Sequence, residues 1–265
     1  MEPGFTSKEI YQKEFDPRAY LNMYYTAGSG LLATNTYLPF VLQNMFKTFT
    51  SGGLKGETLI DLGTGPNIHQ LLSACESFEE IIASDYSEKS RREFEKWLRK
   101  EPGAFDWSSV VKQVCELEGN RKTWIEKEEK LRKTVKQVVR CDVTRSRPLG
   151  QSILPLADCL LSTGCLEYAC KDRDTFQRVL KNISSLLKTG GYLILCSVLG
   201  GTFYMIGSRK FSSLPLEEGF VRKAVAEAGY VIEELEVLAT DHEPRQNICD
   251  YKAVLFLVAR KEKDN

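Results

Sequence analysis

A short apolar segment followed by a glycine turn constrains the fold of this chain more than any other part of the sequence. Residues 58–62 read Thr-Leu-Ile-Asp-Leu, with Asp61 near the end, and Gly63 and Gly65 follow at once. Glycine lets a backbone turn tightly and come close to a ligand because it has no Cβ. Pro66 suits the first turn of a helix, where its missing N–H is not needed. The segment therefore predicts a strand, turn and helix of a doubly wound α/β sheet, whose ligands bind at the carboxyl ends of the strands.

Two positions after this turn indicate which ligand it holds. Ile68 stands where the dinucleotide motif G-x-G-x-x-G has the third glycine that brings a pyrophosphate to the helix N-terminus. The next predicted strand, residues 80–85, ends at Asp85, and a carboxylate there can accept both hydroxyls of a ribose. Together these features favour S-adenosylmethionine over NAD. Taken alone, each also has a structural explanation, as a buried glycine corner or an ordinary strand-end carboxylate.

The overall charge gives no sign of a nucleic-acid or membrane partner. The 265 residues include 36 basic and 36 acidic side chains, so the formal net charge is zero. The N-terminus has no apolar signal core, and no apolar run is long enough to span a membrane. We therefore expect a cytoplasmic, monomeric protein whose partner is a small molecule.

The cysteines and histidines do not form a metal-binding pattern. The eight cysteines include no C-x-x-C pair, and the only histidines are His69 and His242. We expect no metal site, and we expect the thiols to pack in the core as small apolar groups.

The chain is expected to form a single domain with a helical cap. Residues 54–265 should form the α/β core, with a helical insertion at about 101–136 whose charged tail is a solvated face. In the preceding residues 1–53, Pro17 predicts a short helix after Asp16, and residues 38–49 suit an amphipathic helix. The tyrosines of this N-terminal part are expected to cap the ligand site.

Five helix-linked strands and a terminal antiparallel pair are expected in the core. Strands are predicted at residues 58–62, 80–85, 137–143, 157–163, 193–198, 230–239 and 253–260, and helices at residues 87–100, 174–187 and 216–229. Residues 188–192 predict a tight turn before the fifth strand. The loop between the last two strands contains Pro244 and shows no helical periodicity, so those strands should be antiparallel. The predicted fold is Rossmann-like, with a mostly parallel seven-stranded sheet and an antiparallel C-terminal strand.

Several longer motifs resemble a family of small-molecule N-methyltransferases, which includes the nicotinamide, indolethylamine and phenylethanolamine enzymes. The resemblance covers nearly the whole chain. It is carried by F-x-P-R-x-Y-L at 15–21, R-K-E-P at 99–102, F-D-W at 105–107, L-E-G-N at 117–120, R-C-D-V at 140–143, L-K-T-G-G at 187–191 and Y-M-I-G at 204–207. It implies a class I S-adenosylmethionine-dependent methyltransferase fold and a methyl group transferred to nitrogen.

The resemblance also implies how S-adenosylmethionine is held. Asp85 would take the ribose hydroxyls, while Asp142 and the Val143 N–H would bind the adenine edge. The complete implied set is Tyr20, Tyr25, Gly63, Thr64, His69, Asp85, Tyr86, Ser90, Asp142, Val143 and Thr163. His69 and Ser90 depart from the nicotinamide enzyme, which has a tyrosine and an asparagine at these positions.

The acceptor side departs further from the nicotinamide enzyme. That enzyme holds the carboxamide with an aspartate at the position of Ser197 and a serine at that of Ser213, whereas Ser197 has no charge. Tyr24 and Tyr204 are expected to be aromatic walls. Glu167, in the motif C-L-E, resembles the substrate-side glutamate of the phenylethanolamine enzyme, so it is the candidate for binding an ammonium and taking its proton. The structural alternative for Glu167 is a surface carboxylate that caps the next helix.

The expected function is methylation of a small amine or N-heterocycle by S-adenosylmethionine. Methyl transfer is an in-line displacement by a lone pair, so the protein needs to align the two reactants and exclude water. Two alternatives stay open: a relative that binds S-adenosylmethionine with a decayed acceptor site, and a thioether S-methyltransferase. An NAD-dependent oxidoreductase is disfavoured by Ile68.

Overall fold

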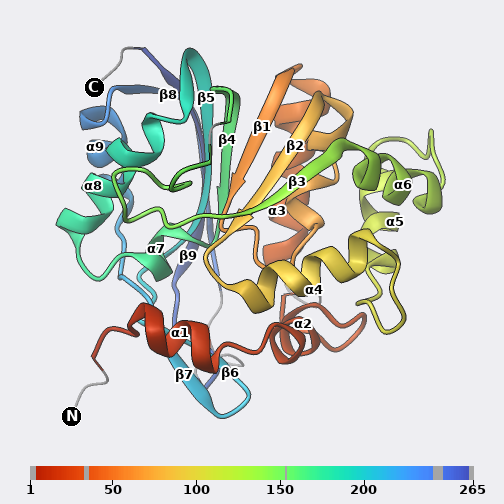
Figure 1. The fold of residues 1–265 in the computed structure, drawn as a ribbon, viewed down its shortest axis with the longest axis horizontal. Helices are drawn as coiled ribbons and strands as arrows, with labels where there is room; N and C mark the ends of the chain where they lie inside the picture. Colours follow the sequence, from red (N-terminus) through yellow and green to blue (C-terminus); the bar gives the residue numbers. More distant parts are fainter. Residues whose placement is uncertain (1–3, 33–35, 153, 241–246, 263–265) are drawn as a thin grey trace.

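A seven-stranded sheet, in the order β3-β2-β1-β4-β5-β9-β8, forms the centre of the molecule (Figure 1). This computed structural model describes residues 4–32, 36–152, 154–240 and 247–262. The strands are β1 (Gly56–Leu62), β2 (Phe78–Asp85), β3 (Val135–Arg140), β4 (Ala157–Thr163), β5 (Leu187–Leu199), β8 (Tyr230–Ala239) and β9 (Ala253–Lys261). Strands β1 to β5 run parallel, whereas β9 is antiparallel to both of its neighbours. The predicted mostly parallel sheet with an antiparallel C-terminal strand is confirmed.

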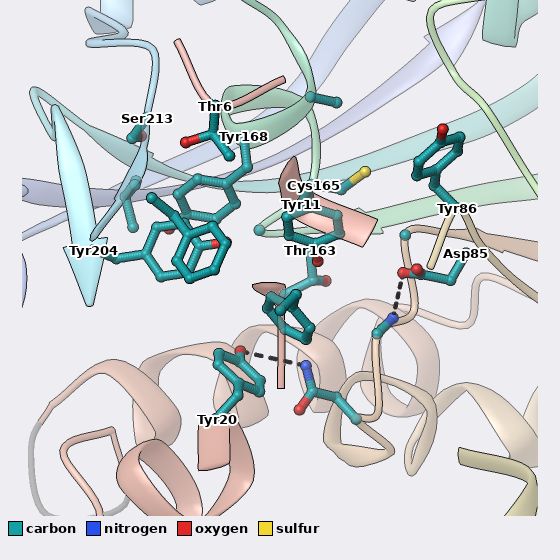
Figure 2. Close-up of a pocket in the computed structure, with 18 of the residues that line it drawn as sticks. Thr6, Tyr11, Tyr20, Asp85, Tyr86, Thr163, Cys165, Tyr168, Tyr204 and Ser213 are labelled. Carbon is teal, nitrogen blue, oxygen red and sulfur yellow. Dashed lines mark hydrogen bonds between the residues drawn. The ribbon is translucent and has the colours of Figure 1, made fainter. Parts of the chain in front are cut away.

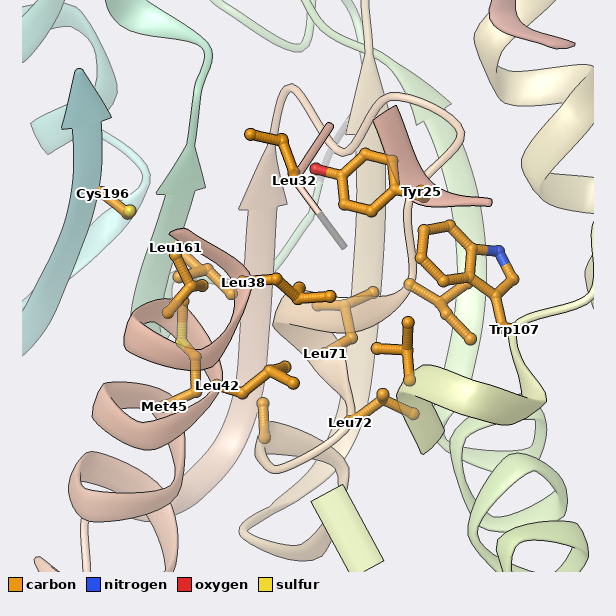
Figure 3. Packing of buried hydrophobic residues seen from close by; sticks show 14 of the residues in the cluster. Tyr25, Leu32, Leu38, Leu42, Met45, Leu71, Leu72, Trp107, Leu161 and Cys196 are labelled. Atoms are coloured by element: carbon orange, nitrogen blue, oxygen red, sulfur yellow. The ribbon is translucent and has the colours of Figure 1, made fainter. Parts of the chain in front are cut away.

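Alternate residues of each strand point to opposite faces of the sheet, and helices cover both faces. Leu59 of β1 packs into one apolar cluster and Ile60 into the other. Figure 3 shows part of the first cluster, where Leu38 and Leu42 of the helix α3 pack near Leu161 of β4. The helices on this face are α3 (Tyr37–Phe46), α4 (Glu88–Leu98), α5 (Ser108–Leu117) and α6 (Trp124–Thr134), and on the other face α8 (Arg173–Ser184) and α9 (Glu218–Glu227) (Figure 1).

The chain after the glycine turn does not form the predicted α-helix. Pro66 lies in a turn, and two short 3-10 helices follow, η2 (His69–Leu71) and η3 (Ala74–Glu76). Every residue from 66 to 75 is buried, so this segment lacks the polar face that a surface helix turns to solvent. The described part of the connection between β3 and β4 is also without a helix. The prediction that helices link all five parallel strands is therefore wrong at these two connections.

Strand β5 begins earlier than its pattern predicted. Leu187 already pairs with Ala157 of β4, so α8 ends at Ser184. The expected tight turn at 188–192 is instead part of the strand, which passes through an irregular register opposite Ala157 and Cys159. Two glycines in this stretch suggested a turn, but they also tolerate an irregular strand.

The charged tail of the insertion is only partly a solvated face. It forms α6, whose Lys127 has no exposed side-chain surface. Lys127 Nζ lies 2.9 Å from Glu76 Oε1 and 2.5 Å from Glu118 Oε2, so two carboxylates compensate for its burial. The expectation that this charged helix is solvated along its whole length is therefore wrong at Lys127. Its partner Glu76 lies 51 positions away, so the sequence of the helix does not show this ion pair.

The helices α1 (Lys8–Glu14) and α2 (Pro17–Tyr25) gather with a small hairpin at the carboxyl ends of the parallel strands (Figure 1). The hairpin consists of β6 (Phe203–Ile206) and β7 (Arg209–Ser212). The helix α2 begins at Pro17, as predicted, and the Asp16 side chain caps it by accepting hydrogen bonds from Arg18 N and Ala19 N. Helix α1 and the hairpin were not predicted, because elements this short show too little periodicity.

The part of the chain that the structure describes contains no helix long and apolar enough to cross a membrane. The same residues contain no cluster of three side chains suited to a metal ion. The described cysteines form no disulfide, and all except Cys165 are buried, which confirms the expected place of these seven in the core. His242 and Pro244 lie outside the described residues.

Candidate active site

A cavity lies where the parallel strands end, between them and the helices α1 and α2. Figure 2 shows that it has two chemically different ends. Asp85 and Tyr86 lie at one end, which also contains Asp142; we call it the carboxylate end. Tyr168, Tyr204 and Ser213 lie at the other, which we call the aromatic end. Between the two ends lie Tyr11, Thr163 and Cys165.

The carboxylate end is built on Asp85, the last residue of β2. Its Oδ2 accepts a hydrogen bond from Gly65 N (2.9 Å), and its Oδ1 accepts one from Ser87 N (2.7 Å). A carboxylate has about four acceptor sites, so Asp85 can also hold a pair of ligand hydroxyls. Burial raises the pKa of Asp85 to about 6, although the two N–H groups oppose this shift. The side chain is therefore mainly ionised at neutral pH.

A second carboxylate, Asp142, follows β3 and is held by a lysine of α1. Lys8 Nζ lies 2.6 Å from Asp142 Oδ2 and 2.5 Å from Thr144 Oγ1. Burial opposes ionisation of Asp142, but the bonds from Lys8 and Thr144 hold its pKa below the ordinary value. Two ionised acids at the ends of neighbouring strands suit the hydroxyls and the amino edge of a nucleoside.

The turn between the two ends leaves no space for a side chain at Gly63. Its φ is +74°, and a Cβ built there would lie 2.3 Å from Cys165 Sγ. Only glycine adopts this conformation without strain and without that contact. Gly63 and Gly65 also line the cavity, so the backbone of the turn lies against it.

Several residues that line the cavity have buried polar atoms with no hydrogen-bond partner among the described residues. These atoms are both ring nitrogens of His69, Asn67 Oδ1, Thr163 Oγ1 and Ser213 Oγ. A buried polar group without a partner costs about 1–3 kcal/mol, so these atoms indicate a polar ligand. Burial lowers the pKa of His69 to about 3, so its imidazole is neutral and offers one donor and one acceptor.

The aromatic end is formed by side chains from α2 and the hairpin, together with Tyr168 from the segment after β4 and Ser213 directly after β7. The Tyr204 ring stacks on that of Phe211 at 5.3 Å and contacts that of Tyr168 at 4.6 Å between centroids. The Tyr24 hydroxyl donates to the Met205 carbonyl (2.7 Å), which ties α2 to the hairpin. This end can enclose a flat aromatic molecule and exclude water from it.

Most of the residues predicted for the site line this cavity. They are Tyr20, Tyr24, Tyr25, Gly63, His69, Asp85, Tyr86, Asp142, Val143, Thr163, Tyr204 and Ser213. The structure does not bring Thr64, Ser90, Ser197 or Glu167 to its surface. Thr64 Oγ1 donates to Asp61 O (3.3 Å) and accepts from Ser84 N (3.1 Å), so it braces the turn from behind. Ser90 is buried in the first turn of α4.

Glu167 is fully buried and is not among the residues that line the cavity, so the surface-carboxylate alternative is wrong, while its role toward an ammonium stays a prediction. It lies in the short helix α7 (Leu166–Ala169). Its carboxylate accepts hydrogen bonds from Val198 N (2.9 Å) and Ser197 Oγ (3.1 Å), and its carbonyl accepts one from Leu214 N (2.8 Å). Glu167 therefore connects α7, the end of β5 and the segment that carries Ser213. Ser197 is its partner rather than a cavity residue.

Replacing Glu167 with glutamine should change how stability depends on pH. Burial raises the pKa of Glu167 from 4.5 to about 7, so the folded protein keeps a proton that the unfolded chain loses. The corresponding stability is present below pH 4.5 and is lost as the pH rises through 7. At 1.36 kcal/mol per pH unit, this loss is roughly 3 kcal/mol, and Glu167→Gln should not show it. Urea unfolding at pH 4.5 and pH 8 measures the difference.

The control for this experiment is Glu116→Gln, on the exposed side of α5. It should keep the wild-type difference between the two pH values. If Glu167→Gln also keeps that difference, the proposed burial of the carboxyl group is wrong.

Several cavity residues were not predicted, namely Lys8, Tyr11, Phe15, Asn67, Tyr168 and Phe211. Asn67 directly follows the glycine turn, so its position in the sequence could have identified it. The aromatic residues were visible in the sequence but were not distinguishable from ordinary core residues. Lys8 carries no local signal, because its partner lies 134 positions away.

The arrangement fits the predicted cofactor. Asp85 and Asp142 suit its ribose and adenine, and the turn at Gly63 and Gly65 presents bare backbone to its chain. The ring nitrogens of His69 and the Oδ1 of Asn67, which lack partners among the described residues, suit its polar amino-acid end. The aromatic end would then face the group that receives the methyl.

Comparison with known proteins agrees with this interpretation. The model of the NNMT/PNMT/TEMT family matches residues 2–262. Human nicotinamide N-methyltransferase is 54% identical over 261 residues, with 98% of each chain covered. Mouse indolethylamine N-methyltransferase is 47% identical over 253 residues, covering 96% of this chain and 95% of its own.

Among solved structures, the magnesium protoporphyrin IX methyltransferase of Synechocystis PCC 6803, with bound SAH, has a TM-score of 0.59. The match covers 97% of this chain and 100% of that protein. At 14% identity, this similarity shows the fold alone.

Proposed function

This chain belongs to the NNMT/PNMT/TEMT family and is an S-adenosylmethionine-dependent N-methyltransferase, and we propose that its preferred acceptor is a small aromatic N-heterocycle of the nicotinamide type. The observation that carries this choice is the aromatic end of the cavity, which has no charged side chain among the described residues. Nicotinamide is the acceptor named for the human relative.

The roles of the cofactor-binding residues form part of this proposal. S-adenosylmethionine supplies a methyl group made electrophilic by its positive sulfur. Asp85 binds the ribose hydroxyls, and Asp142 with the Val143 N–H binds the adenine edge. The ring nitrogens of His69 and the Oδ1 of Asn67, which lack partners among the described residues, bind the amino-acid end. The chain contributes to the reaction by alignment and by exclusion of water.

The charges around the cavity distinguish between acceptor classes. Lys8, Asp85 and Asp142, the charged side chains that line its described part, belong to the carboxylate end. An alkylamine is mostly protonated at neutral pH and needs a base before it can react. Glu167 is not among the residues that line the cavity, and its carboxylate already accepts hydrogen bonds from Val198 N and Ser197 Oγ, so we do not assign it as that base. A pyridine-type nitrogen already has a free lone pair, so it needs only to be held in position.

The aromatic end also offers a group for a carboxamide. Ser213 lines the cavity, and its buried hydroxyl has no partner among the described residues. It can donate to a carbonyl or accept from an amide N–H. Tyr204 and Tyr24, which both line the cavity, provide flat aromatic walls for the acceptor. We therefore expect recognition by stacking and one hydroxyl contact, without a charge at Ser197.

A methyl-transfer screen with labelled S-adenosylmethionine tests the proposal. At pH 7, kcat/KM for nicotinamide and other pyridines should exceed that for tryptamine or phenylethanolamine by at least about tenfold, because few of these amines are unprotonated. Between pH 7 and pH 9 the amine rates should rise by about tenfold per unit, whereas the pyridine rates should stay nearly level.

The same screen separates the alternatives. Faster transfer to tryptamine than to nicotinamide at pH 7 would contradict the acceptor proposal. Preferred transfer to a thioether would indicate the S-methyltransferase alternative, and transfer to no acceptor would indicate a decayed site. A cytoplasmic, monomeric enzyme that does not bind nucleic acid remains part of the proposal, supported for nucleic acid by the zero net charge.

A further inference from the structure

Residues 5–15, here called the N-terminal strap, are bonded to both ends of the cavity. At the carboxylate end, Lys8 Nζ lies 2.6 Å from Asp142 Oδ2 and 2.8 Å from Oδ1. At the aromatic end, Thr6 N donates to Ser212 Oγ (2.7 Å), and Ser212 N donates to Thr6 Oγ1 (2.9 Å). Thr6 and Lys8 are only two positions apart, so one short stretch of backbone joins the loop after β3 to the hairpin.

The rest of the strap also packs on the hairpin. The ring of Tyr11 contacts that of Phe211 at 6.0 Å, and the ring of Phe15 contacts it at 5.9 Å. Glu14 Oε2 lies 2.7 Å from Arg209 Nη2. These contacts tie the strap to β7, so the two segments should move together.

The ion pair between Lys8 and Asp142 is partly shielded from water. The Asp142 side chain is 9% exposed and that of Lys8 is 37% exposed. Such a pair is less screened than one between fully exposed side chains. The other described cation near Asp142 is Arg145, at 3.4 Å with a side chain that is 73% exposed. Lys8 is therefore the main positive partner of this carboxylate and the one that connects it to the hairpin.

We propose that Lys8 is a positioning residue that transmits occupancy of the carboxylate end to the acceptor walls on the hairpin. This inference rests on the proposed function, in which the cofactor nucleoside lies against Asp142. A ligand bound there limits the motion of the Asp142 carboxylate, and thereby the motion of Lys8 and the strap. The strap, which packs on the hairpin, then orders Tyr204 and Phe211. Cofactor binding thus prepares the aromatic end before the acceptor arrives, and by reciprocity a bound acceptor tightens cofactor binding.

Hydrogen exchange of the full-length protein with S-adenosylhomocysteine as probe tests the coupling. In the wild type, the probe should slow exchange at least about fivefold in two places: the glycine turn at 63–65 and the hairpin at 203–212. Lys8→Met keeps the aliphatic stem but removes the charge. It should keep the protection of the turn, which shows that the variant folds and binds, and should lose more than half of the protection of the hairpin.

Three further variants separate coupling from general stability. Lys8→Arg keeps the charge and should restore protection of the hairpin. Thr6→Val removes the acceptor of Ser212 N and should reproduce the Lys8→Met result from the other end of the strap. Lys13→Met changes an 82% exposed lysine of the same helix and should behave like the wild type.

Wild-type protection of the hairpin in Lys8→Met, at saturating probe, would overturn the inference. If the probe does not slow exchange at the glycine turn of the wild type, the proposed position of the cofactor is wrong. The coupling through Lys8 would then be wrong as well. A different preferred acceptor in the methyl-transfer screen would contradict only the proposed acceptor, because this exchange experiment contains none.

Discussion

Asp85→Ala should weaken binding of S-adenosylhomocysteine by at least about 100-fold. The Asp85 carboxylate is placed to accept two ribose hydroxyls, and each charge-assisted hydrogen bond contributes roughly 1.5–3 kcal/mol. The combined loss of roughly 3–6 kcal/mol corresponds to at least about two powers of ten in Kd. Asp85→Asn keeps one acceptor oxygen for Gly65 N or Ser87 N and should weaken binding less. Titration calorimetry at 25 °C gives both values.

Asp158→Ala is a matched control for this loss. Asp158 Oδ2 also accepts two backbone hydrogen bonds, from Glu57 N (2.9 Å) and Thr58 N (3.0 Å), but at the opposite end of β1. Its replacement should lower stability while leaving the affinity for S-adenosylhomocysteine within about twofold. Similar affinities for the Asp85 and Asp158 variants would contradict the assignment of Asp85 to the ribose hydroxyls. Circular dichroism of each variant checks that the fold survives.

Gly63→Ala should be among the most destabilising single substitutions in the core of this protein. A Cβ at Gly63 would lie 2.3 Å from Cys165 Sγ and 2.5 Å from Cys165 Cβ, and its φ is +74°. Left-handed backbone costs a non-glycine residue about 1–2 kcal/mol, and overpacking adds about 1–3 kcal/mol. We expect a loss of roughly 2–5 kcal/mol, which lowers Tm by about 5–15 °C. Thermal unfolding followed by circular dichroism measures it.

Gly28→Ala separates the two contributions. Gly28 has the same φ of +74°, but a Cβ there would meet no atom within 4 Å. This variant should lose only the stability that left-handed backbone costs a non-glycine residue, roughly 1–2 kcal/mol. Adding Cys165→Gly to Gly63→Ala should recover part of the loss, because it removes both atoms that the new Cβ meets. Equal losses for Gly63→Ala and Gly28→Ala would mean that the Cys165 contact is readily relaxed.

The sequence predicted the sheet and the acid at the end of β2 because both depend on local properties of the chain. Apolar runs of strand length and their spacing indicated the parallel strands, and the missing crossover helix indicated the antiparallel C-terminal pair. A residue at the carboxyl end of a parallel strand lies at the edge of the sheet where ligands bind, and this position does not depend on how distant segments pack. For that reason Asp85 and Gly63 were found without knowledge of the structure.

The motif resemblance extended this local prediction to residues such as Tyr20 and Asp142, which line the cavity. It did not settle where every side chain points. Ser90 and Glu167 were expected at the ligand, yet both are buried and neither is among the residues that line the cavity. A motif specifies which residue type occupies a backbone position, whereas the direction of its side chain depends on what packs around it.

Only the tertiary structure decided the features that join distant segments. Lys8 and Asp142 are 134 positions apart, and Thr6 and Ser212 are 206 apart, so no local pattern links either pair. Likewise, Lys127 looks like an ordinary surface charge until its two carboxylate partners surround it. Periodicity and backbone sterics act within a few residues and can be deduced from sequence alone. Burial, ion pairing and the pKa of a side chain depend on which remote segments arrive beside it, and the packing of the whole chain determines that.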